Sequence, residues 1–241
     1  MADKKTIAIF GARTGLGASL ARRFGREGYR VALVARSAGP LEERVAELSA
    51  KQIEAAGFPG DLTDIPSLAG LVRLIEERFG SIDVAIYSPS PSNLGFVPAV
   101  GLDAATLQTM TPIFSYAPVE VAHAVLPGML NRAEGAIVLV TGLSAVVTMP
   151  GLSGVGPAMA AARNYLLTLN AEVAGKGVFA GSVSIGAMIE RSAGMRAATA
   201  GGASLDPSFP VLDPDDIAEE IWSFVARRDQ PEIILPRQNQ A

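Results

Sequence analysis

Glycines at positions 11, 15 and 17 have the spacing and the setting of a phosphate-binding turn. They follow the apolar run TIAIF and open a segment, LGASLARRF, with a helical pattern. Glycine lets a backbone turn tightly and approach a phosphate, and the free N–H groups of a helix N-terminus attract its charge. Three glycines can also form an ordinary turn from strand to helix. Their place after the first predicted strand favours a bound dinucleotide, with Gly11, Gly15 and Gly17 against its pyrophosphate.

The end of the second predicted strand, VALVARS, indicates which dinucleotide this would be. An acidic side chain there holds the ribose hydroxyls of NAD, whereas a basic one suits the 2′-phosphate of NADP. This chain has Ala35 followed by Arg36. Arg13 could reach the same phosphate, because it lies inside the glycine turn. Either arginine alone is equally well explained as a solvated surface charge. Two arginines beside a missing acid favour NADP.

Residues 151–162, GLSGVGPAMAAA, carry no ionisable side chain and therefore offer no acid or base. The chain has no cysteine, which excludes a thiolate nucleophile, and its single His123 cannot build a histidine metal site alone. His123 lies in the apolar run VEVAHAVLP, where a packed or interface histidine is expected rather than a general base. No metal site is predicted.

Short β-branched runs alternate with longer helical patterns, which indicates crossover connections and a parallel sheet buried on both faces. The predicted strands are Thr6–Phe10, Arg30–Ala35, Gln52–Ala56, Ile82–Tyr87, Ala136–Thr141, Val178–Ser184 and Glu232–Leu235. The predicted helices are Leu16–Glu27, Pro40–Ser49, Ile65–Phe79, Asp103–Asn131, Ala158–Gly175 and Pro214–Arg228. Asp64 and Asp213 are expected as helix N-caps, and Gly28 and Gly80 as helix stops.

Composition limits the partners. A net charge of −4 and a pI near 5.1 do not provide the positive surface that nucleic acids or anionic membranes attract. The uncharged stretch 136–162 is long enough to span a bilayer, but Pro150 and Pro157 interrupt any helix there. No targeting segment is recognised. We expect a single cytoplasmic domain, residues 1–241, with irregular segments at 88–102 and 186–213 that suit binding loops.

The glycine spacing G-x-x-x-G-x-G and the motifs that follow it resemble the short-chain dehydrogenase/reductase family. Beyond GARTGLG these motifs are GDLTD after the third strand, AVLPGM in the fourth helix and KGV before the sixth strand. The resemblance covers nearly the whole chain. It implies an α/β fold with a Rossmann-type, doubly wound, seven-stranded parallel sheet in three α/β/α layers. It assigns the cofactor to Gly11, Arg13, Thr14, Gly15, Leu16, Gly17, Arg36, Asp61, Leu62 and Ser88, with Asp61 at the adenine.

The same resemblance implies a catalytic Ser, Tyr, Lys and Asn, and this chain departs from all four. Gly142 stands at the Ser position, Val155 at the Tyr, Met159 at the Lys and Phe114 near the Asn. Hydride transfer to a carbonyl leaves charge on oxygen, which must be protonated or held by donors. The substitutes considered are Ser144, Tyr116, Tyr87 and Tyr165, each better explained as a loop or packing residue, and Arg163 with Asn164 as a contact for an anion or a partner subunit. No catalytic residue is therefore assigned.

Two functions remain open. One is an NADP(H)-dependent oxidoreductase with a non-standard active site, acting on a small molecule with a substitute acid, water or no acid. The other is a non-catalytic NADP(H)-binding sensor or assembly subunit. Positioning alone contributes about 7–11 kcal/mol to catalysis, so the oxidoreductase is favoured despite the missing acid. The family also pairs its fourth and fifth helices, which implies a homodimer or homotetramer. Alanines within 158–162 would either permit that approach or pack on the sheet of one subunit.

Overall fold

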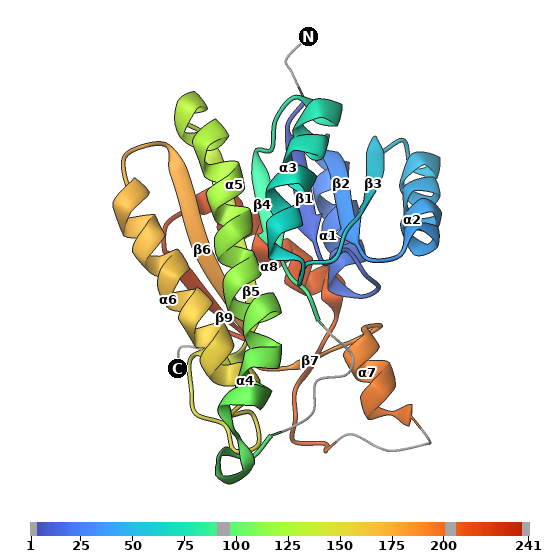
Figure 1. Ribbon diagram of the computed structural model, residues 1–241. Coiled ribbons are helices and arrows are strands. Elements are labelled where there is room, and N and C mark those ends of the chain that lie inside the picture. Colours follow the sequence, from blue (N-terminus) through green and yellow to red (C-terminus); the bar gives the residue numbers. More distant parts are fainter. Residues whose placement is uncertain (1–3, 91–96, 201–205, 238–241) are drawn as a thin grey trace.

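A seven-stranded parallel sheet forms the centre of the protein (Figure 1). The computed structural model describes residues 4–90, 97–200 and 206–237. The strands of the sheet are β1 (Thr6–Phe10), β2 (Arg30–Ala35), β3 (Ala55–Pro59), β4 (Val84–Tyr87), β5 (Gly135–Gly142), β6 (Val178–Ile185) and β9 (Glu232–Leu235). A separate parallel pair consists of β7 (Met188–Ile189) and β8 (Val211–Leu212). The predicted doubly wound, seven-stranded sheet is confirmed.

The strand order is β3-β2-β1-β4-β5-β6-β9. From β1 the chain moves outward through β2 to β3, and then returns to place β4 on the opposite side of β1. Ligands of such sheets bind beyond the carboxyl ends of the strands where the order reverses. Phe10 and Tyr87 pair in register at the ends of β1 and β4 and mark that place. The glycine turn follows Phe10 directly, and Ser88 follows Tyr87.

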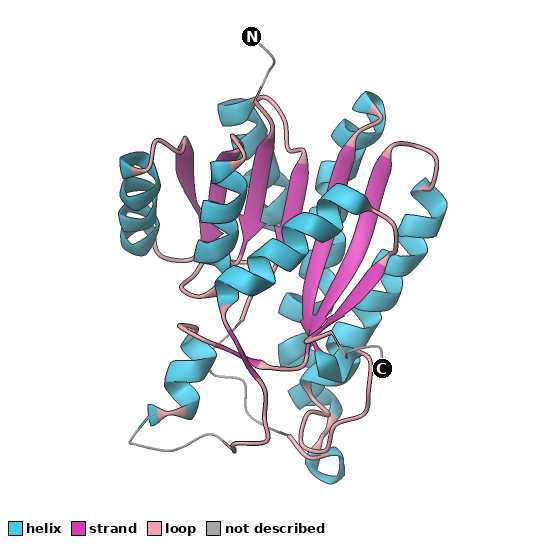
Figure 2. Ribbon diagram, turned by 180° about the vertical axis from the view of Figure 1, so that it is seen from behind, coloured by secondary structure: helices cyan, strands magenta, loops and turns pink. Residues whose placement is uncertain are grey.

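Helices cover both faces of the sheet and give three layers (Figures 1 and 2). One face packs on α1 (Leu16–Arg26), α2 (Ala38–Ala50) and α8 (Pro214–Arg227). The other packs on α3 (Ile65–Phe79), α5 (Ala117–Arg132) and α6 (Val155–Val173). Central strands such as β1 are buried along their whole length, because both faces are covered. Two shorter helices, α4 (Ala104–Thr111) and α7 (Ala193–Ala198), lie beyond the carboxyl ends of the strands.

The third strand begins later than predicted, at Ala55 instead of Gln52. Lys51 caps α2, and Gln52 has a φ of 60°, so these residues form the turn that ends the helix. The strand continues instead through Gly57, where an added Cβ would lie 3.0 Å from the Cβ of Leu41. Because β3 begins later than predicted, its carboxyl end lies at Pro59 instead of Ala56. Gly60 and Asp61 therefore begin at the same edge of the sheet as the glycine turn.

The helix predicted over Asp103–Asn131 is divided into α4, a π-helical turn at Pro112–Tyr116 and α5. A proline ring clashes with the carbonyl four residues earlier, and Pro118 stands four residues after Phe114. A wider turn relieves that clash. Helix α6 begins at Val155, earlier than the predicted Ala158. Both Phe114 and Val155 therefore lie on turns that face the carboxyl edge of the sheet.

Two helix caps were predicted, and one of them is formed. The carboxylate of Asp213 accepts a hydrogen bond of 2.7 Å from the N–H of Asp215, which satisfies a free donor of α8. Asp64 occupies the predicted N-cap position before α3, but its side chain makes no capping hydrogen bond. Within the segment expected to be irregular at 186–213, the chain forms β7, α7 and β8, and within 88–102 it forms a short 3-10 turn at Ala99–Gly101. Parts of these two segments, 91–96 and 201–205, lie outside the described residues.

One helical run in the described chain, Ala104–Arg132, is long and apolar enough to cross a membrane by length and composition alone. Of its most apolar window, 44% is buried inside the protein. Core helices of globular proteins meet the same criterion, and this run packs against α3 and the sheet. The uncharged stretch 136–162, for which the sequence predicts no membrane span, is divided among β5, a 3-10 turn and the start of α6.

Candidate functional site

The glycine turn after β1 has no room for side chains at two of its positions. Gly11 has a φ of 102°, and a Cβ there would lie 2.7 Å from the backbone nitrogen of Pro89. A Cβ on Gly17 would lie 2.9 Å from the Cα of Ala12. Gly15 adds a second left-handed conformation, with a φ of 80°. Only glycine meets both the positive φ and the close approach, and the turn leaves the N-terminus of α1 open to a ligand.

Ser88 supplies a polar group that lacks a partner. Its backbone N–H donates to the carbonyl oxygen of Phe10 at 2.8 Å, which fixes the residue at the reversal of the sheet. Its hydroxyl is buried and has no hydrogen-bond partner within the described residues, and the residue itself lies in the wall of the cavity beside the glycine turn. A buried hydroxyl without a partner costs about 1–3 kcal/mol. A polar ligand such as a ribose fits this position.

Two cavities adjoin the glycine turn and have walls in common. The first, of about 240 Å³, runs from Gly11 toward the ends of β5 and β6. The second, of about 290 Å³, runs the opposite way past Ala35 and Arg36 to Gly60 and Leu62. Gly11, Arg13, Pro89 and Ser90 line both. The combined depression has two lobes on either side of the glycine turn, which is the arrangement required by a molecule with two nucleoside ends. We call the first the hydride-end cavity and the second the adenine-end cavity.

Asp61 stands at the rim of the adenine-end cavity and is held as a carboxylate. It accepts hydrogen bonds of 2.9 Å from the backbone N–H and the hydroxyl of Thr63. The N–H bond is the main cause that lowers the pKa of Asp61, with a smaller contribution from the positive charge of Arg36. Leu62 is buried beside it. An ionised acceptor next to an apolar wall suits the amino group and ring of an adenine.

Arg13 and Arg36 lie on one further cavity of about 230 Å³, together with Thr14, Ser37, Arg44 and Arg196. Arg13 and Arg36 were predicted from the sequence to lie together, whereas Arg44 and Arg196 were not predicted here. Arg44 lies on α2, and its guanidinium pairs with Glu47. Arg196 belongs to α7, in a segment expected to be irregular, so no sequence signal placed it here. We call this the arginine cavity.

The four positions that the resemblance equated with catalytic groups meet in the hydride-end cavity. Gly142, Val155, Met159 and Phe114 all line it. Phe114, Val155 and Met159 also belong to one apolar cluster, with Met110, Ala145 and Ala158. The hydroxyls of Thr141 and Ser184 lie 3.0 Å apart in a buried hydrogen bond next to this wall. Within the described residues, no acid, base or cation lies among these groups, apart from Arg13 at the glycine turn.

The substitutes considered from the sequence lie elsewhere or are already engaged. The hydroxyl of Tyr87 donates to the carbonyl of Ile113 at 2.6 Å, and burial raises the pKa of Tyr87 far above its usual range. Burial also raises the pKa of Tyr165, which packs against the core. Tyr116 is 57% exposed on the π-helical turn. Ser144 lines a separate depression outside the hydride-end cavity.

Arg163 and His123 do not belong to the site either. The guanidinium of Arg163 forms a bidentate ion pair with Glu232 at the edge strand β9. This pairing raises the pKa of Arg163. It also neutralises the charge of the side chain that the sequence suggested as a contact for an anion. His123 is exposed on α5 instead of packed in the subunit's core. No group of three or more His, Asp or Glu side chains in the described part of the chain is placed to hold a metal ion.

The α7 segment, residues 188–199, closes the hydride-end cavity from outside. Met188, Ile189, Ser192 and Gly194 line it. Ser192 caps α7 by accepting from the N–H of Met195 at 2.9 Å, and its Cα would lie 3.1 Å from a Cβ on Gly15. The segment therefore rests directly on the glycine turn.

The sheet reversal, the glycine turn and the two-lobed depression define a protein of the dinucleotide-binding α/β class. A sequence model of the family described as short chain dehydrogenase matches residues 5–198. The chain belongs to the short chain dehydrogenase family.

Individual relatives agree with this assignment. A "Dehydrogenase/reductase SDR family protein 7-like" of Drosophila melanogaster is 28% identical over 239 residues, covering 96% of this chain and 72% of the relative. Among solved structures, ElxO with NADP bound matches with a TM-score of 0.84 at 21% identity, covering 96% of this chain and 97% of that one. An actinorhodin polyketide ketoreductase with NADPH matches with a TM-score of 0.84 at 21% identity, covering 97% and 96%. At such identity the structural likeness supports the fold.

Proposed function

We propose that the protein is an NADP(H)-dependent oxidoreductase with a non-standard active site, acting on a small molecule. The observation that carries the proposal is the pair of lobes around the glycine turn, with Arg13 and Arg36 beside Ala35 at the adenine end. Arg36 stands where an acid would reject a phosphate on the ribose. The NADP and NADPH bound by the two solved relatives are consistent with this choice.

Each part of the depression has a separate task. The N–H groups of the turn at Gly15 and Leu16 would bind the pyrophosphate, with Thr14 next to them. Asp61 and Leu62 would hold the adenine, Arg13 and Arg36 the 2′-phosphate, and Ser88 a polar group of the nicotinamide half. When bound, the nicotinamide supplies or accepts a hydride. The residues around the hydride end exclude water and orient the substrate.

The apolar wall of the hydride-end cavity limits the chemistry. Val155 and Met159 cannot donate a proton, and Gly142 has no side chain. A proton for a reduced oxygen would come from water or from the Thr141 and Ser184 hydroxyl pair, whose mutual bond leaves only one hydroxyl hydrogen free. Substrates that need no strong acid, such as activated alkenes, suit this wall better than simple ketones.

The second candidate is a non-catalytic NADP(H)-binding sensor or assembly subunit. It is favoured by the packing of Phe114, Val155 and Met159 into one apolar cluster at the place where the family has its acid–base set. Both candidates share the cofactor. We further propose a cytoplasmic homodimer or homotetramer that binds neither nucleic acid nor a membrane.

The test is a titration with NADPH and NADH, followed by a turnover screen over ketones, quinones and enones. NADPH binding with turnover of any of these supports the oxidoreductase. NADPH binding without turnover supports the sensor. Failure to bind either dinucleotide contradicts both.

A further inference from the structure

The arginine cavity gathers four cations from four places along the chain. Arg13 comes from the glycine turn, Arg36 and Arg44 from the end of β2 and from α2, and Arg196 from α7. Arg44 is neutralised by Glu47. The other three form no ion pair within the described residues. Like charges brought together repel one another, and a bound anion removes that cost.

Arg196 is held only by neutral groups. One of its nitrogens donates to the carbonyl oxygen of Arg191 at 3.1 Å, and another donates to the hydroxyl of Thr14 at 2.8 Å. Hydrogen bonds of a cation to a carbonyl and a hydroxyl are weaker than a bidentate bond to a phosphate. The exposed guanidinium therefore has a better partner available if a dianion enters the cavity. The hydrogen bond to Thr14 already holds the guanidinium of Arg196 at the rim of the arginine cavity.

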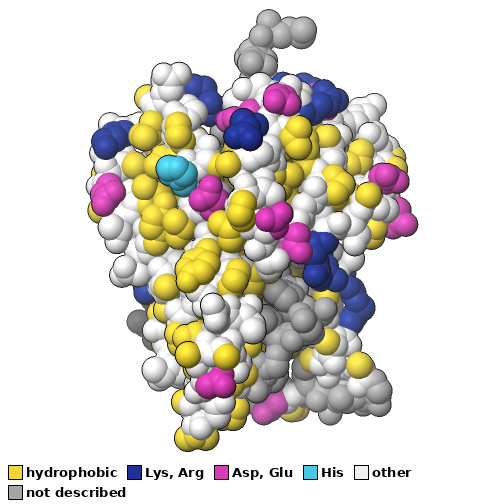
Figure 3. All heavy atoms as spheres, viewed as in Figure 1, with side chains coloured by type: hydrophobic (Ala, Val, Ile, Leu, Met, Phe, Trp, Pro, Cys, Tyr) yellow, Lys and Arg dark blue, Asp and Glu magenta, His cyan; other side chains and the backbone are white. Residues whose placement is uncertain are grey.

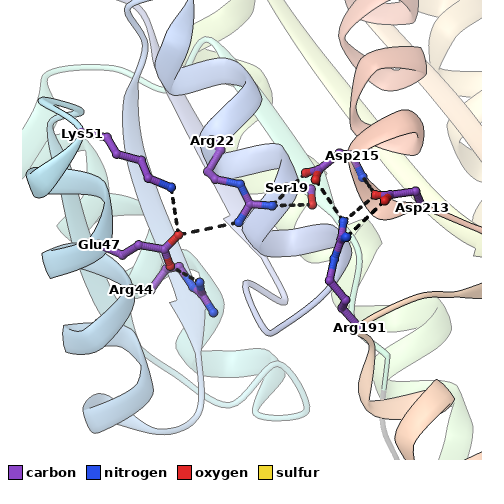
Figure 4. A network of polar contacts seen from close by, with 8 residues as sticks. All are labelled: Ser19, Arg22, Arg44, Glu47, Lys51, Arg191, Asp213 and Asp215. Carbon is purple, nitrogen blue, oxygen red and sulfur yellow. Dashed lines mark hydrogen bonds and ion pairs between the residues drawn. The ribbon is translucent and has the colours of Figure 1, made fainter.

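The start of the α7 segment is fixed independently of any ligand. Figure 4 shows Arg191 between the carboxylates of Asp213 and Asp215. The guanidinium of Arg191 donates to both carboxylate oxygens of Asp213, at 2.5 and 3.1 Å, and to one oxygen of Asp215 at 3.0 Å. The other oxygen of Asp215 accepts from Arg22 on α1 at 2.8 Å. With this end tied to α8 and α1, the Arg196 contact on Thr14 is where a phosphate in the arginine cavity would reach α7.

We propose that Arg196 is a specificity-determining residue for the phosphorylated cofactor. The 2′-phosphate is held from two sides, by Arg13 and Arg36 of the nucleotide-binding half and by Arg196 of α7. Because α7 also lines the hydride-end cavity, the phosphorylated dinucleotide adds a charged attachment to that wall. With the unphosphorylated dinucleotide the wall keeps only the Arg191 ion pairs and the hydrogen bonds of Arg196 to neutral groups. This inference rests on the proposed cofactor and adds to it a residue, outside the nucleotide-binding half, that links the two ends of the site.

The first experiment measures dissociation constants for NADPH and NADH by fluorescence titration with wild type, Arg196→Gln and Arg196→Lys. Loss of one charge-assisted bond to phosphate is expected to weaken NADPH binding about tenfold or more and to leave NADH within about twofold. Arg196→Lys keeps the positive charge but loses the paired N–H donors of the guanidinium, so its affinity for NADPH is expected to lie between those of wild type and Arg196→Gln. Arg78→Gln is the matched control, since it removes an arginine from the last turn of α3, at the opposite edge of the sheet.

The second experiment follows trypsin cleavage of the wild type after Arg196 with saturating NADPH or NADH. Slower cleavage with NADPH than with NADH supports the inference. Equal cleavage contradicts the proposed fixing of α7.

The outcomes separate this inference from the proposed function. A wild type that prefers NADPH while Arg196→Gln keeps the same preference overturns the inference and leaves the proposed function standing. Equal weakening of both dinucleotides assigns Arg196 a structural role and also overturns it. An Arg196-dependent affinity for inorganic phosphate as strong as that for NADPH would assign the cavity to a free anion, against the inference. A wild type that binds neither dinucleotide contradicts the proposed function, and the inference with it.

Discussion

The backbone N–H of Gly142 donates a hydrogen bond to the sulfur of Met159, 3.4 Å away, in the wall of the hydride-end cavity. The methyl carbon of Met159 would lie 3.5 Å from a Cβ on Gly142. A Cβ at position 142 would therefore touch Met159 at ordinary van der Waals distance, without displacing it. The two positions are coupled instead through the N–H to sulfur bond, because a substitution of Met159 removes the acceptor of the Gly142 N–H.

Restoring the acid–base pair by Val155→Tyr with Met159→Lys is expected to give a less stable protein with little ketone reduction. Met159 is 8% exposed within an apolar cluster, so a lysine there is buried without a partner, at a cost of several kcal/mol. Gly142 and Phe114, at the other two positions that the resemblance equates with catalytic groups, supply no polar side chain, and catalytic groups act as a unit. The measurements are a thermal melt and a ketone panel with NADPH.

Met159→Leu is the control for that pair, because it keeps the volume and is expected to cost less than about 1.5 kcal/mol. A folded double variant that gained a thousandfold or more in ketone reduction would contradict the prediction. The cavity would then be that of a recently disabled reductase.

Gly11→Ala is expected to lower both stability and dinucleotide affinity. The left-handed backbone alone costs about 1–2 kcal/mol for a residue with a side chain. The added Cβ would also lie 2.7 Å from the backbone nitrogen of Pro89, which must then shift together with Ser88. Gly28→Ala is the control, since Gly28 also has a positive φ of 86° but has open space around it. A Gly11 variant that binds NADPH as tightly as Gly28→Ala would show that the turn does not contact the cofactor.

The sequence predicted the parts of the site whose chemistry is local. Glycines between a strand and a helix specify their own backbone, so Gly11, Gly15 and Gly17 could be placed before the fold was known. Arg196 could not, because its role depends on α7 folding back across the glycine turn. The shift of β3 to Ala55 depends on the left-handed Gln52, which no propensity favours. The π-helical turn at Phe114 is explained by the clash that Pro118 would cause in a regular helix. The helical pattern of apolar residues does not predict this effect.

The Asp213 carboxylate is expected to stabilise the fold in a pH-dependent way. The N–H of Asp215, and then the Arg191 guanidinium, hold the pKa of Asp213 below its usual range. A lowered pKa contributes stability that is fully present above the unfolded value, about 3.9, and is lost as the pH falls through the folded value. Thermal melts of wild type and Asp213→Asn between pH 7 and pH 3 check this. The gap in Tm should be widest at neutral pH and should shrink below about pH 4. A gap that does not change with pH would assign the stabilisation to the cap geometry instead of the charge.

The surface of α5 and α6 is expected to pair two copies of the chain. Figure 3 shows hydrophobic side chains gathered over these helices, and Leu130 of α5 is among the exposed ones. The small-residue run of α6 divides between two roles: Ala158 and Ala162 are buried within the subunit, whereas Ala161 is exposed. Packing on the sheet therefore explains only part of that run. Light scattering at micromolar concentration is expected to give a dimer or tetramer for wild type.

Ala161→Glu is expected to shift that assembly toward monomer, because a charge on a closely packed helix pair must be desolvated without a partner. Ala46→Glu, on the exposed face of α2, introduces the same charge away from α5 and α6 and should leave the mass unchanged. A melting temperature close to that of wild type in both variants separates dissociation from unfolding. A monomeric wild type would contradict the predicted pairing through α5 and α6. If Ala161→Glu and Ala46→Glu keep the assembly equally well, the subunits pair through another face, and α6 serves only to cover the sheet.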